Sequence, residues 1–539
     1  MPHVPPTPVA ERRPAPGHRS LQGRFDELAR AHRVPGAQLA LHTGTQVISV
    51  HTGTADAATG APFTEDTAVP TGSVTKLCTA AVVTLLAEDG DLELDEPAAV
   101  LLPELRRLPQ VTVRHLLSHT SGLPTGPDSD TAAGWTAARH LASVCSPRDL
   151  LFAPGTGFSY SNAGYVAAGR LVEEVTGMTW REAVRALLLE PLGIRPAFLG
   201  DAAPHRPVAA GHARNTASGR PMPVAQNLAP VEAPAGALLA GALDLLALGR
   251  ALAGRSTALP PAAAAWMCRP VPGAHPGALA DAWGAGAALF RGADRWWCGH
   301  DGNAQGTSCH LRADPGTGVV VAFTGNASSA TAMWRELAGE IAEFTGPAVP
   351  ASPRPVPGRN RSPLPPGCAG SYRNGSAEYR VGLDASGHPF LSVDGDLPLP
   401  LVCYADLSFD LADPASGRRE PGGRFHRDPL TGVLDRVQIS GRAARRVPDP
   451  QARPRSVDVR AAGARAADAS GPGVPAVRPP GAAVPVTGSS VKAARVEARS
   501  PAGGPVSAPA ARPDSATATA TSPWPACTGR PQDAPPSPR

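Results

Sequence analysis

The first periodic segment of the chain places Leu21, Phe25, Leu28 and His32 on one face of a helix. This spacing predicts an amphipathic helix that ends before Pro35-Gly36. The run that follows, from Gly36 to Gly53, reads as two β segments around Thr43-Gly44-Thr45. We therefore expect a β-hairpin directly after the first helix.

A second pair of strands is expected far along the chain. Ser308 to Leu311 and Val319 to Thr324 flank the turn residues Asp314-Pro315-Gly316. The helix predicted next has an apolar stripe made of Met333, Trp334, Leu337, Ile341 and Phe344. Because the sequence between the two ends is mostly helical and loop-like, we expect one sheet built from both ends, with a helical insert between them.

One apolar stretch, Gly236 to Gly254, approaches the length of a membrane span. Asp244 and Arg250 interrupt it, and the preceding PVEAPAG carries no basic anchor. A buried helix is the better interpretation, because spans need about 20 uninterrupted apolar residues.

The pattern changes after residue 345. Residues 346–366 hold eight prolines, which predicts a stiff linker. Tyr372 to Val447 then shows short β runs, which predicts a small antiparallel meander or barrel. The turn signals between the runs are Asn374-Gly375, Ala385-Ser386-Gly387, Asp394-Gly395, Gly422-Gly423 and Thr431-Gly432.

From Gln451 onward the chain has no Leu, Ile, Phe, Met or Tyr, so burial cannot offset its chain entropy. The domains expected are therefore a disordered N-terminus (1–20), a main domain (21–345), a linker (346–366), a small β domain (367–448) and a disordered tail (449–539).

Charge and composition exclude several classes of protein. The 539 residues carry a net charge of +4, but the segment after residue 450 holds eleven Lys and Arg against five Asp and Glu. The basic excess belongs to the tail, so it does not indicate nucleic-acid or membrane binding by the folded part. Eight cysteines without paired short spacings argue against a disulfide scaffold or a zinc site. With no apolar signal segment near the start, we expect a cytoplasmic protein, unless a misassigned start codon hides an export signal.

Candidate chemistry begins at Thr71-Gly72-Ser73-Val74-Thr75-Lys76, which opens a helical run. Ser73 and Lys76 lie on the same helix face. A serine hydroxyl needs a nearby base or positive charge to act as a nucleophile, and the first helical turn adds free N–H groups. Taken alone, Ser-x-x-Lys is more typical of a helix cap followed by a solvated lysine.

Two further motifs follow in order. In Tyr160-Ser161-Asn162, a tyrosine beside a lysine can have its pKa depressed and serve as general base, and the Asn162 amide can orient Lys76 or a substrate carbonyl. A buried aromatic residue with a turn asparagine would look the same.

In His300-Asp301-Gly302-Asn303, Gly302 allows a strand to approach a ligand closely. The N–H groups of Asn303 and Ser73 are candidates for one oxyanion hole. A β-turn with an exposed histidine is the structural alternative.

Taken together, these three motifs resemble the serine β-lactamase and penicillin-binding-protein-like hydrolases, in the branch of class C β-lactamases, esterases and D-aminopeptidases. Three auxiliary segments agree with that family: Gly90 to Pro97, Val113 to Pro124 and Ala233 to Leu252. The resemblance covers about residues 21–345. It implies an α/β (α+β) fold of the β-lactamase/transpeptidase type, with an antiparallel sheet flanked by helices, a helical lobe and a site at their junction.

The resemblance also settles some local questions. His115 and His119 have the spacing of a metal-binding pair on a helix, but the family has a structural helix end there, and we expect no metal and no cofactor. His300 stands where β-lactamases carry a lysine, which favours an esterase or D-aminopeptidase. Residues 367–448 look like the lipocalin-like domains appended to some members, either as a cap on the site or as an inert accessory.

The hypothesis is a serine hydrolase that forms an acyl-enzyme at Ser73, with Lys76 and Tyr160 as catalytic partners. Asn162, His300, Gly302 and Asn303 are expected to bind the substrate or its oxyanion. The expected substrate is a small ester, amide or D-amino-acid peptide, with no nucleic-acid or membrane partner. Three alternatives remain open: acyl transfer to an acceptor other than water, a D-alanyl-D-alanine carboxypeptidase or β-lactamase, and a catalytically dead scaffold.

Overall fold

The computed structural model describes residues 18–202, 204–215, 219–353, 359–412, 419–428 and 430–448. The first helix, α1 (His18–Ala31), begins three residues earlier than the predicted domain boundary. Residues 1–17 and the tail at 449–539, both predicted to be disordered, lie outside the described residues.

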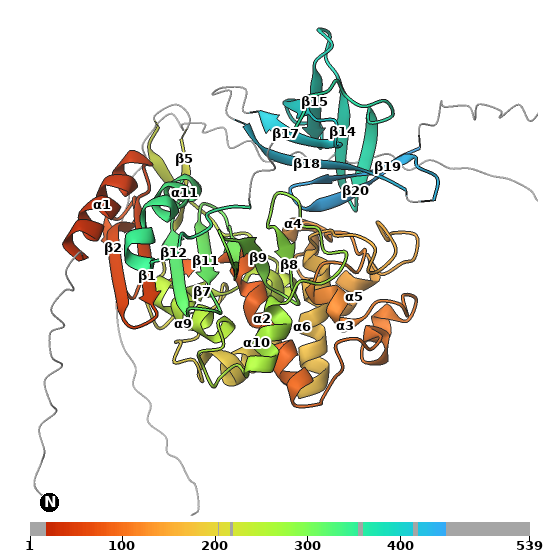
Figure 1. The fold of residues 1–539 in the computed structure, drawn as a ribbon. Coiled ribbons are helices and arrows are strands. Elements are labelled where there is room, and N and C mark those ends of the chain that lie inside the picture. The colour runs from red at the N-terminus through yellow and green to blue at the C-terminus, as the bar shows by residue number, and fades with distance from the viewer. Residues whose placement is uncertain are drawn as a thin grey trace, which may run out of the picture. The chain divides into compact units, whose positions relative to one another are not determined.

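Within the described residues, one antiparallel sheet joins the two ends of the main domain (Figure 1). Its strands, in spatial order, are β3 (Ala61–Pro62), β2 (Val47–Asp56), β1 (Gly36–Thr43), β12 (Val319–Gly325), β11 (Ser308–Ala313), β10 (Trp296–Gly302), β9 (Ala288–Arg291) and β8 (Ala282–Trp283). The central pairing is β1 with β12, where Leu39 lies opposite Phe323. Both predicted strand pairs, and the predicted assembly of the sheet from distant segments, are confirmed.

Helices cover both faces of this sheet, as alternate residues of β12 demonstrate. Val321 and Phe323 pack with α1 and α11 (Ala330–Glu340), whereas Val320 and Ala322 pack with α9 (Ala242–Leu252). A strand that is buried on both sides cannot alternate with polar residues, which explains the continuous apolar run.

The helical lobe lies between the two halves of the sheet in sequence. Its helices are α2 (Thr75–Glu88), α3 (Val113–Leu117), α4 (Ser129–Ala132), α5 (Ala137–Ala142), α6 (Asn162–Thr176), α7 (Trp180–Val184), α8 (Ala233–Gly236) and α10 (Pro261–Cys268), with short turns η1 (Gly72–Val74), η2 (Ala98–Val100), η3 (Pro103–Leu105), η4 (Arg185–Leu189) and η5 (Pro230–Glu232). α12 (Ala342–Thr345) follows α11. No helix in the described part of the chain is long and apolar enough to cross a bilayer.

The apolar stretch 236–254 contains the predicted buried helix only over Ala242–Leu252, and the prediction was wrong for the residues before it. Leu239 and Ala240 form strand β7 (Leu239–Ala240), which pairs with β4 (Val69–Pro70). The helix α9 starts only after Gly241, where the Ala242 N–H donates to the Gln38 side chain at 2.7 Å. The short pairing ties this stretch to the residues that precede Ser73. Another small pair, β5 (Gly211–Arg214) with β6 (Pro221–Val224), lies outside the main sheet.

The C-terminal β domain is a closed barrel, which confirms the predicted all-β module. Its strands follow chain order: β13 (Gly370–Asn374), β14 (Ala377–Leu383), β15 (Pro389–Val393), β16 (Leu399–Cys403), β17 (Ser408–Ala412), β18 (Arg419–Arg427), β19 (Leu434–Ile439) and β20 (Arg442–Arg446). β13 and β20 close it, with Tyr372 opposite Arg446. Phe409, Phe425 and Val437 fill its interior.

One turn expected in the barrel is absent from its predicted place. Gly422 and Gly423 lie inside β18, where the pairing with β17 shifts register. A Cβ at Gly423 would lie 1.8 Å from the Gln438 carbonyl oxygen. The two glycines therefore permit a close approach of strands and do not make a turn.

The predicted linker is attached to both folded parts. Near its start, the carbonyl groups of Pro350 and Ala351 accept hydrogen bonds from the buried Arg312 guanidinium. Near its end, the Ser362 N–H donates to the Cys403 carbonyl at 3.0 Å. Between these attachments, residues 354–358 lie outside the described residues.

Candidate active site

Ser73 lies in the tight turn η1, two residues before α2 begins, and not inside the α-helix as predicted. Gly72 enables the turn: its φ is +52°, and a Cβ there would lie 2.2 Å from the Asn303 carbonyl oxygen. Gly302 meets the same turn from β10, since a Cβ there would lie 2.1 Å from the Thr71 carbonyl oxygen. Two glycines thus bring the end of β10 against the turn that holds Ser73.

Lys76 is completely buried on α2 and faces Ser73. Its Nζ lies 3.2 Å from Ser73 Oγ, 2.9 Å from Asn162 Oδ1 and 2.9 Å from the Ala235 carbonyl oxygen. Burial lowers the pKa of Lys76 to about 7; the positive charge of Arg442 adds to this effect, and the negative charge of Glu232 opposes it. The neutral amine is therefore accessible near neutral pH.

The three neighbours of Lys76 determine what its neutral form does. A neutral amine has two N–H groups and one lone pair, and the oxygens of Asn162 and Ala235 can only accept hydrogen bonds. They therefore take both N–H groups. The lone pair is left for Ser73, whose hydroxyl must then donate to Lys76 Nζ.

Tyr160 is buried beside this pair. Lys76 Nζ lies 4.9 Å from the centre of the Tyr160 ring, so the hydroxyl, the amine and the phenol come together although they are distant in sequence. Burial raises the pKa of Tyr160 well above its usual value, although Ser73 and the Arg442 charge both favour the phenolate. The phenol oxygen has no hydrogen bond of full geometry to any described residue.

The expectation that Lys76 would depress the pKa of Tyr160 was therefore wrong. The cost of burying a phenolate exceeds the attraction of the nearby charges. Lys76 also carries only a partial charge near neutral pH. Tyr160 is a neutral phenol here, which can donate a proton but is a poor base.

Asn162 is held in a defined orientation by Glu232, a residue that the sequence analysis did not single out. The Asn162 Nδ2 donates to Glu232 Oε1 at 3.4 Å, while its Oδ1 accepts from Lys76. Since a carboxylate only accepts, the amide nitrogen must face it. The Ser129 hydroxyl donates to the other oxygen of Glu232. No local motif marks Glu232 in the sequence, because it reaches the site through a packing of η5 against α6.

The end of β10 supplies the other predicted site residues. β9 pairs with β10 only as far as Gly299, so residues 300–302 pair with β11 but not with β9. Asn303 and Ser73 both line one cavity of about 360 Å³, together with Asn162 and Glu232. The structure thus brings Asn303 to the nucleophile, as the oxyanion interpretation requires.

His300 lies behind this cavity and is not on its wall. Its Nδ1 contacts the Asp301 carbonyl oxygen at 2.6 Å, and its ring lies 5.3 Å from that of Trp283. Burial, with the Lys76 charge, lowers the pKa of His300 to about 4, so the ring is neutral at pH 7. It cannot bind a substrate carboxylate by charge as a lysine would.

The two histidines in α3 and in the turn after it accept hydrogen bonds from backbone N–H groups. His115 Nδ1 accepts from the Thr112 N–H at 3.2 Å, and His119 Nδ1 accepts from the Ser161 N–H at 3.1 Å. The His119 ring also lies 4.3 Å from that of Tyr160. Among the described residues, no group of three or more His, Cys, Asp or Glu side chains is arranged to hold a metal ion.

The barrel reaches the same site through the turn between β19 and β20. The Tyr160 N–H donates to the Gly441 carbonyl at 2.9 Å, and the Ala443 N–H donates to the Ser159 hydroxyl at 3.2 Å. The Arg442 guanidinium lies 5.5 Å from the centre of the Tyr160 ring. These contacts favour the cap interpretation of the barrel over the inert accessory.

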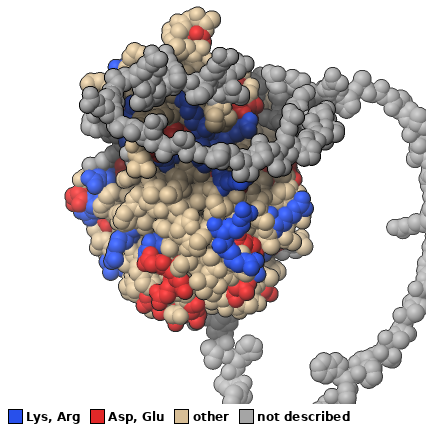
Figure 2. Space-filling view, turned by 90° about the vertical axis from the view of Figure 1, so that its right-hand side faces the viewer, with Lys and Arg blue, Asp and Glu red and all other residues tan. Residues whose placement is uncertain are grey.

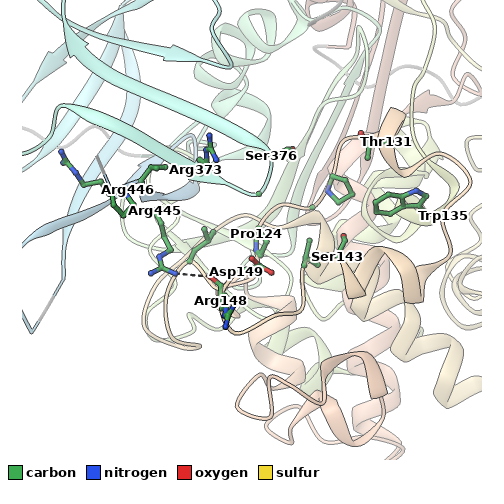
Figure 3. A pocket seen from close by; sticks show the side chains of 17 residues that line it. Pro124, Thr131, Trp135, Ser143, Arg148, Asp149, Arg373, Ser376, Arg445 and Arg446 are labelled. Atoms are coloured by element: carbon green, nitrogen blue, oxygen red, sulfur yellow. Dashed lines mark hydrogen bonds between the residues drawn. The ribbon is translucent and has the colours of Figure 1, made fainter. Parts of the chain in front are cut away.

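A second cavity, of about 630 Å³, lies where the loops around Pro124 and Arg148 meet the barrel (Figure 3). Arg373, Arg445 and Arg446 of the barrel strands are among the residues that line it. Arg445 donates to the carbonyl groups of Arg148 and Leu150, and Arg373 pairs with Glu378. Ser73 does not line this cavity, which is therefore separate from the cavity that contains Ser73. On the surface in Figure 2, basic and acidic side chains are interspersed.

Comparison with known proteins identifies the family. A sequence model of the family described as Beta-lactamase matches residues 21–345. The chain belongs to the β-lactamase family. Its relatives there include esterases and amidases, so the chain is a serine hydrolase of this family that acts on ester or amide bonds.

Two proteins are similar in sequence to this β-lactamase-family chain. It is 34% identical over 385 residues to penicillin-binding protein 4 of Amycolatopsis lactamdurans, a match that covers 67% of the chain and 99% of that protein. It is 36% identical over 228 residues to the esterase EstB of Burkholderia gladioli, with coverage of 38% and 56%.

Solved structures of this β-lactamase-family fold are also similar. SurE shares 38% identity with a TM-score of 0.71, over 80% of this chain and 99% of SurE. The D-amino acid amidase of Ochrobactrum anthropi SV3 shares 28% identity with a TM-score of 0.50, over 57% and 91%. The match to SurE therefore extends well beyond residues 21–345.

Proposed function

We propose that the protein cleaves its substrate through an acyl-enzyme formed on Ser73. The observation that carries the proposal is the arrangement around Lys76, whose two acceptor neighbours leave the lone pair of its neutral form for the Ser73 proton. Lys76 then acts as the general base that activates the serine, a contribution of typically about 10²–10⁴-fold in rate. This assignment replaces the anionic Tyr160 as base.

The oxyanion of the tetrahedral intermediate would be held by the N–H groups of Ser73 and Asn303. Ser73 lies at the start of η1, where a helix leaves amide donors without an internal partner. Asn303 follows directly after β10 and lines the same cavity. Donors fixed in this way stabilise developing charge without having to reorganise.

Tyr160 would act as a proton donor to the leaving group and as a relay toward Lys76. Its raised pKa suits a group that gives up a proton only when a strong base develops beside it. Gly302 lets the strand approach the turn, and His300 supports the phenol from behind as a neutral ring.

Two relatives guide the choice of substrate. One structure of SurE contains D-Leu, and the Ochrobactrum amidase acts on D-amino acid amides by its name. We therefore propose D-amino-acid amides and esters as the first substrates to test. Acyl transfer to an amine acceptor uses the same residues and is a second candidate, because the barrel reaches the site through the hydrogen bond between Tyr160 and Gly441.

The test compares Ser73→Ala with the wild-type protein on a chromogenic short-chain ester and on D-phenylalanine amide. We expect turnover to fall at least about a thousandfold, because the covalent step is lost. Ser143→Ala, which removes an exposed serine of the helical lobe, is the matched control.

Intact-mass spectrometry separates the remaining alternatives. The wild type should gain the mass of the acyl group, or of a fluorophosphonate, at Ser73 only. Undiminished turnover by Ser73→Ala, or absence of any adduct, would contradict the proposal and favour a scaffold. Added D-amino acid that diverts the product from acid to amide would identify a transferase. A stable adduct with penicillin would indicate a penicillin-binding function.

A further inference from the structure

The cavity that contains Ser73 has an unusual charge. Among the described residues that line it, Glu232 is the one ionisable side chain. Its neighbours on the wall are neutral: Asn162, Ser129, Asn227 and Gln305. Glu232 is therefore the one charged group that the described residues place on the cavity wall, and Lys76, which contacts Ser73 and Asn162, lies beneath that wall.

Glu232 is buried but not paired. It is 3% exposed, and its two oxygens accept from Ser129 Oγ and Asn162 Nδ2, which are both neutral groups. No arginine, lysine or histidine within the described part of the chain forms an ion pair with it. A carboxylate has about four lone-pair positions, so Glu232 retains capacity for further donors.

Buried carboxylates are normally paired, because an isolated buried charge is costly. A second acid nearby, Asp130, accepts from the Asn227 side chain and is exposed, so water already solvates it. Glu232 differs because its open side faces a cavity large enough for a substrate. A positively charged group of a molecule bound in that cavity would complete an ion pair with Glu232.

We propose that Glu232 binds the ammonium group of the substrate, and so selects esters and amides whose acyl part carries a free amine. Asn162 links the two functions, since it contacts Lys76 on one side and Glu232 on the other at 2.9 and 3.4 Å. An amino group held at Glu232 thus lies one amide side chain away from the catalytic lysine. This proposal rests on the proposed function, because it concerns the acyl group that Ser73 attacks.

The same charge opposes a different class of substrate. Penicillins and D-alanyl-D-alanine peptides carry a carboxylate close to the scissile bond. A carboxylate in this cavity meets Glu232 and finds no cation among the described residues on the wall. The cavity therefore discriminates against such substrates by repulsion as well as by the lack of an attractive partner.

The test uses a matched pair of substrates, D-phenylalanine p-nitrophenyl ester and 3-phenylpropionic acid p-nitrophenyl ester, which differ only by the amine. For the wild type, kcat/KM should favour the amine at least tenfold at pH 7. In Glu232→Gln that preference should fall by at least tenfold, mainly through KM. Glutamine can still accept from Asn162 and meet the Ser129 hydroxyl, so the wall keeps its shape.

A positioning role for Glu232 predicts a different result. If Glu232 only orients Asn162, both esters should slow equally in Glu232→Gln and the preference should stay as in the wild type, which would overturn the proposal. Asp130→Asn is the matched control, and it should leave the preference unchanged. Equal rates for the two esters in the wild type would also overturn it. A failure of the proposed Ser73 mechanism would give a different result. In that case Ser73→Ala would still hydrolyse the 3-phenylpropionic acid ester, which carries no amine.

Discussion

At the scale of single residues, the proposed mechanism makes the activity depend on one proton of Lys76. Its amine is buried with two carbonyl-type acceptors and a serine hydroxyl, and its pKa is lowered to about 7. The protonated form donates to all three oxygens, including Ser73 Oγ, and cannot accept the serine proton. The neutral form can accept it, so catalytic competence should follow the titration of this amine.

The proposed role of Lys76 predicts that kcat/KM increases with pH. As pH rises through about 7, Lys76 loses its proton, so kcat/KM should rise and reach a plateau above this pH. His300 titrates near pH 4 and should not contribute at higher pH. The profile of an ester substrate between pH 5 and 9 measures the midpoint. A flat profile over this range would contradict the role of Lys76.

At the scale of elements, the site depends on contacts between β10, β11 and the turn η1. Asp301 on β10 receives the Arg312 guanidinium of β11 at 2.6 Å and the His310 ring at 2.8 Å. These positive partners hold the pKa of Asp301 well below its usual value despite burial. Arg312 also donates to Pro350 and Ala351, so one buried cation connects both strands with the start of the linker.

Arg312→Met should therefore destabilise the main domain. Removing one partner of a buried ion pair costs about 3–5 kcal/mol, and we expect a loss of that size in the free energy of unfolding at pH 7. The Asp301 carboxylate stabilises the fold above about pH 4, and this contribution disappears as pH falls and the group is protonated. The deficit of the variant should therefore shrink in acid.

Denaturant unfolding at pH 7 and in acid measures this effect. Arg170→Gln, which breaks an exposed pair with Glu174 on α6, is the control and should cost less than about 1 kcal/mol. Equal losses for the two variants would show that Arg312 has no special structural role.

The sequence predicted the strands and the order of the motifs well, because both depend on local pattern. Hairpins at Thr43-Gly44-Thr45 and Asp314-Pro315-Gly316 carry turn residues between apolar runs. Prediction from the sequence failed where the structure depends on contacts between residues that are distant in sequence. Leu239 becomes a strand because it pairs with Pro70, and the ionisation of Tyr160 depends on how deeply distant segments bury it. Glu232 and Arg442 reach the site from elements without any recognisable motif.

At the scale of the whole molecule, the barrel is an electrostatic part of the hydrolase site. Arg442 on β20 lowers the pKa of Lys76, whereas Glu232 raises it. No ion pair joins this guanidinium to a carboxylate among the described residues, and it lies 5.5 Å from the centre of the Tyr160 ring. The two domains therefore share control of a single proton.

Arg442→Gln should move the pH profile. Loss of a positive charge raises the pKa of Lys76, so the rising limb should shift to higher pH while the plateau remains. At pH 6.5 we expect kcat/KM of the variant to lie about threefold or more below that of the wild type, whereas the two proteins should agree at pH 9. Arg380→Gln, on the barrel but outside the site cavity, serves as control. An unchanged midpoint in Arg442→Gln would show that the barrel charge does not reach Lys76.

The backbone hydrogen bond from Tyr160 to Gly441 makes the thermal stability of the activity depend on the smaller domain. On heating, turnover should vanish as soon as the barrel comes away, even while the sheet and helices stay folded. A chimaera in which another domain replaces the barrel would need to retain the loop at residues 440–442. Without this loop, we expect the main domain to fold but to show no turnover.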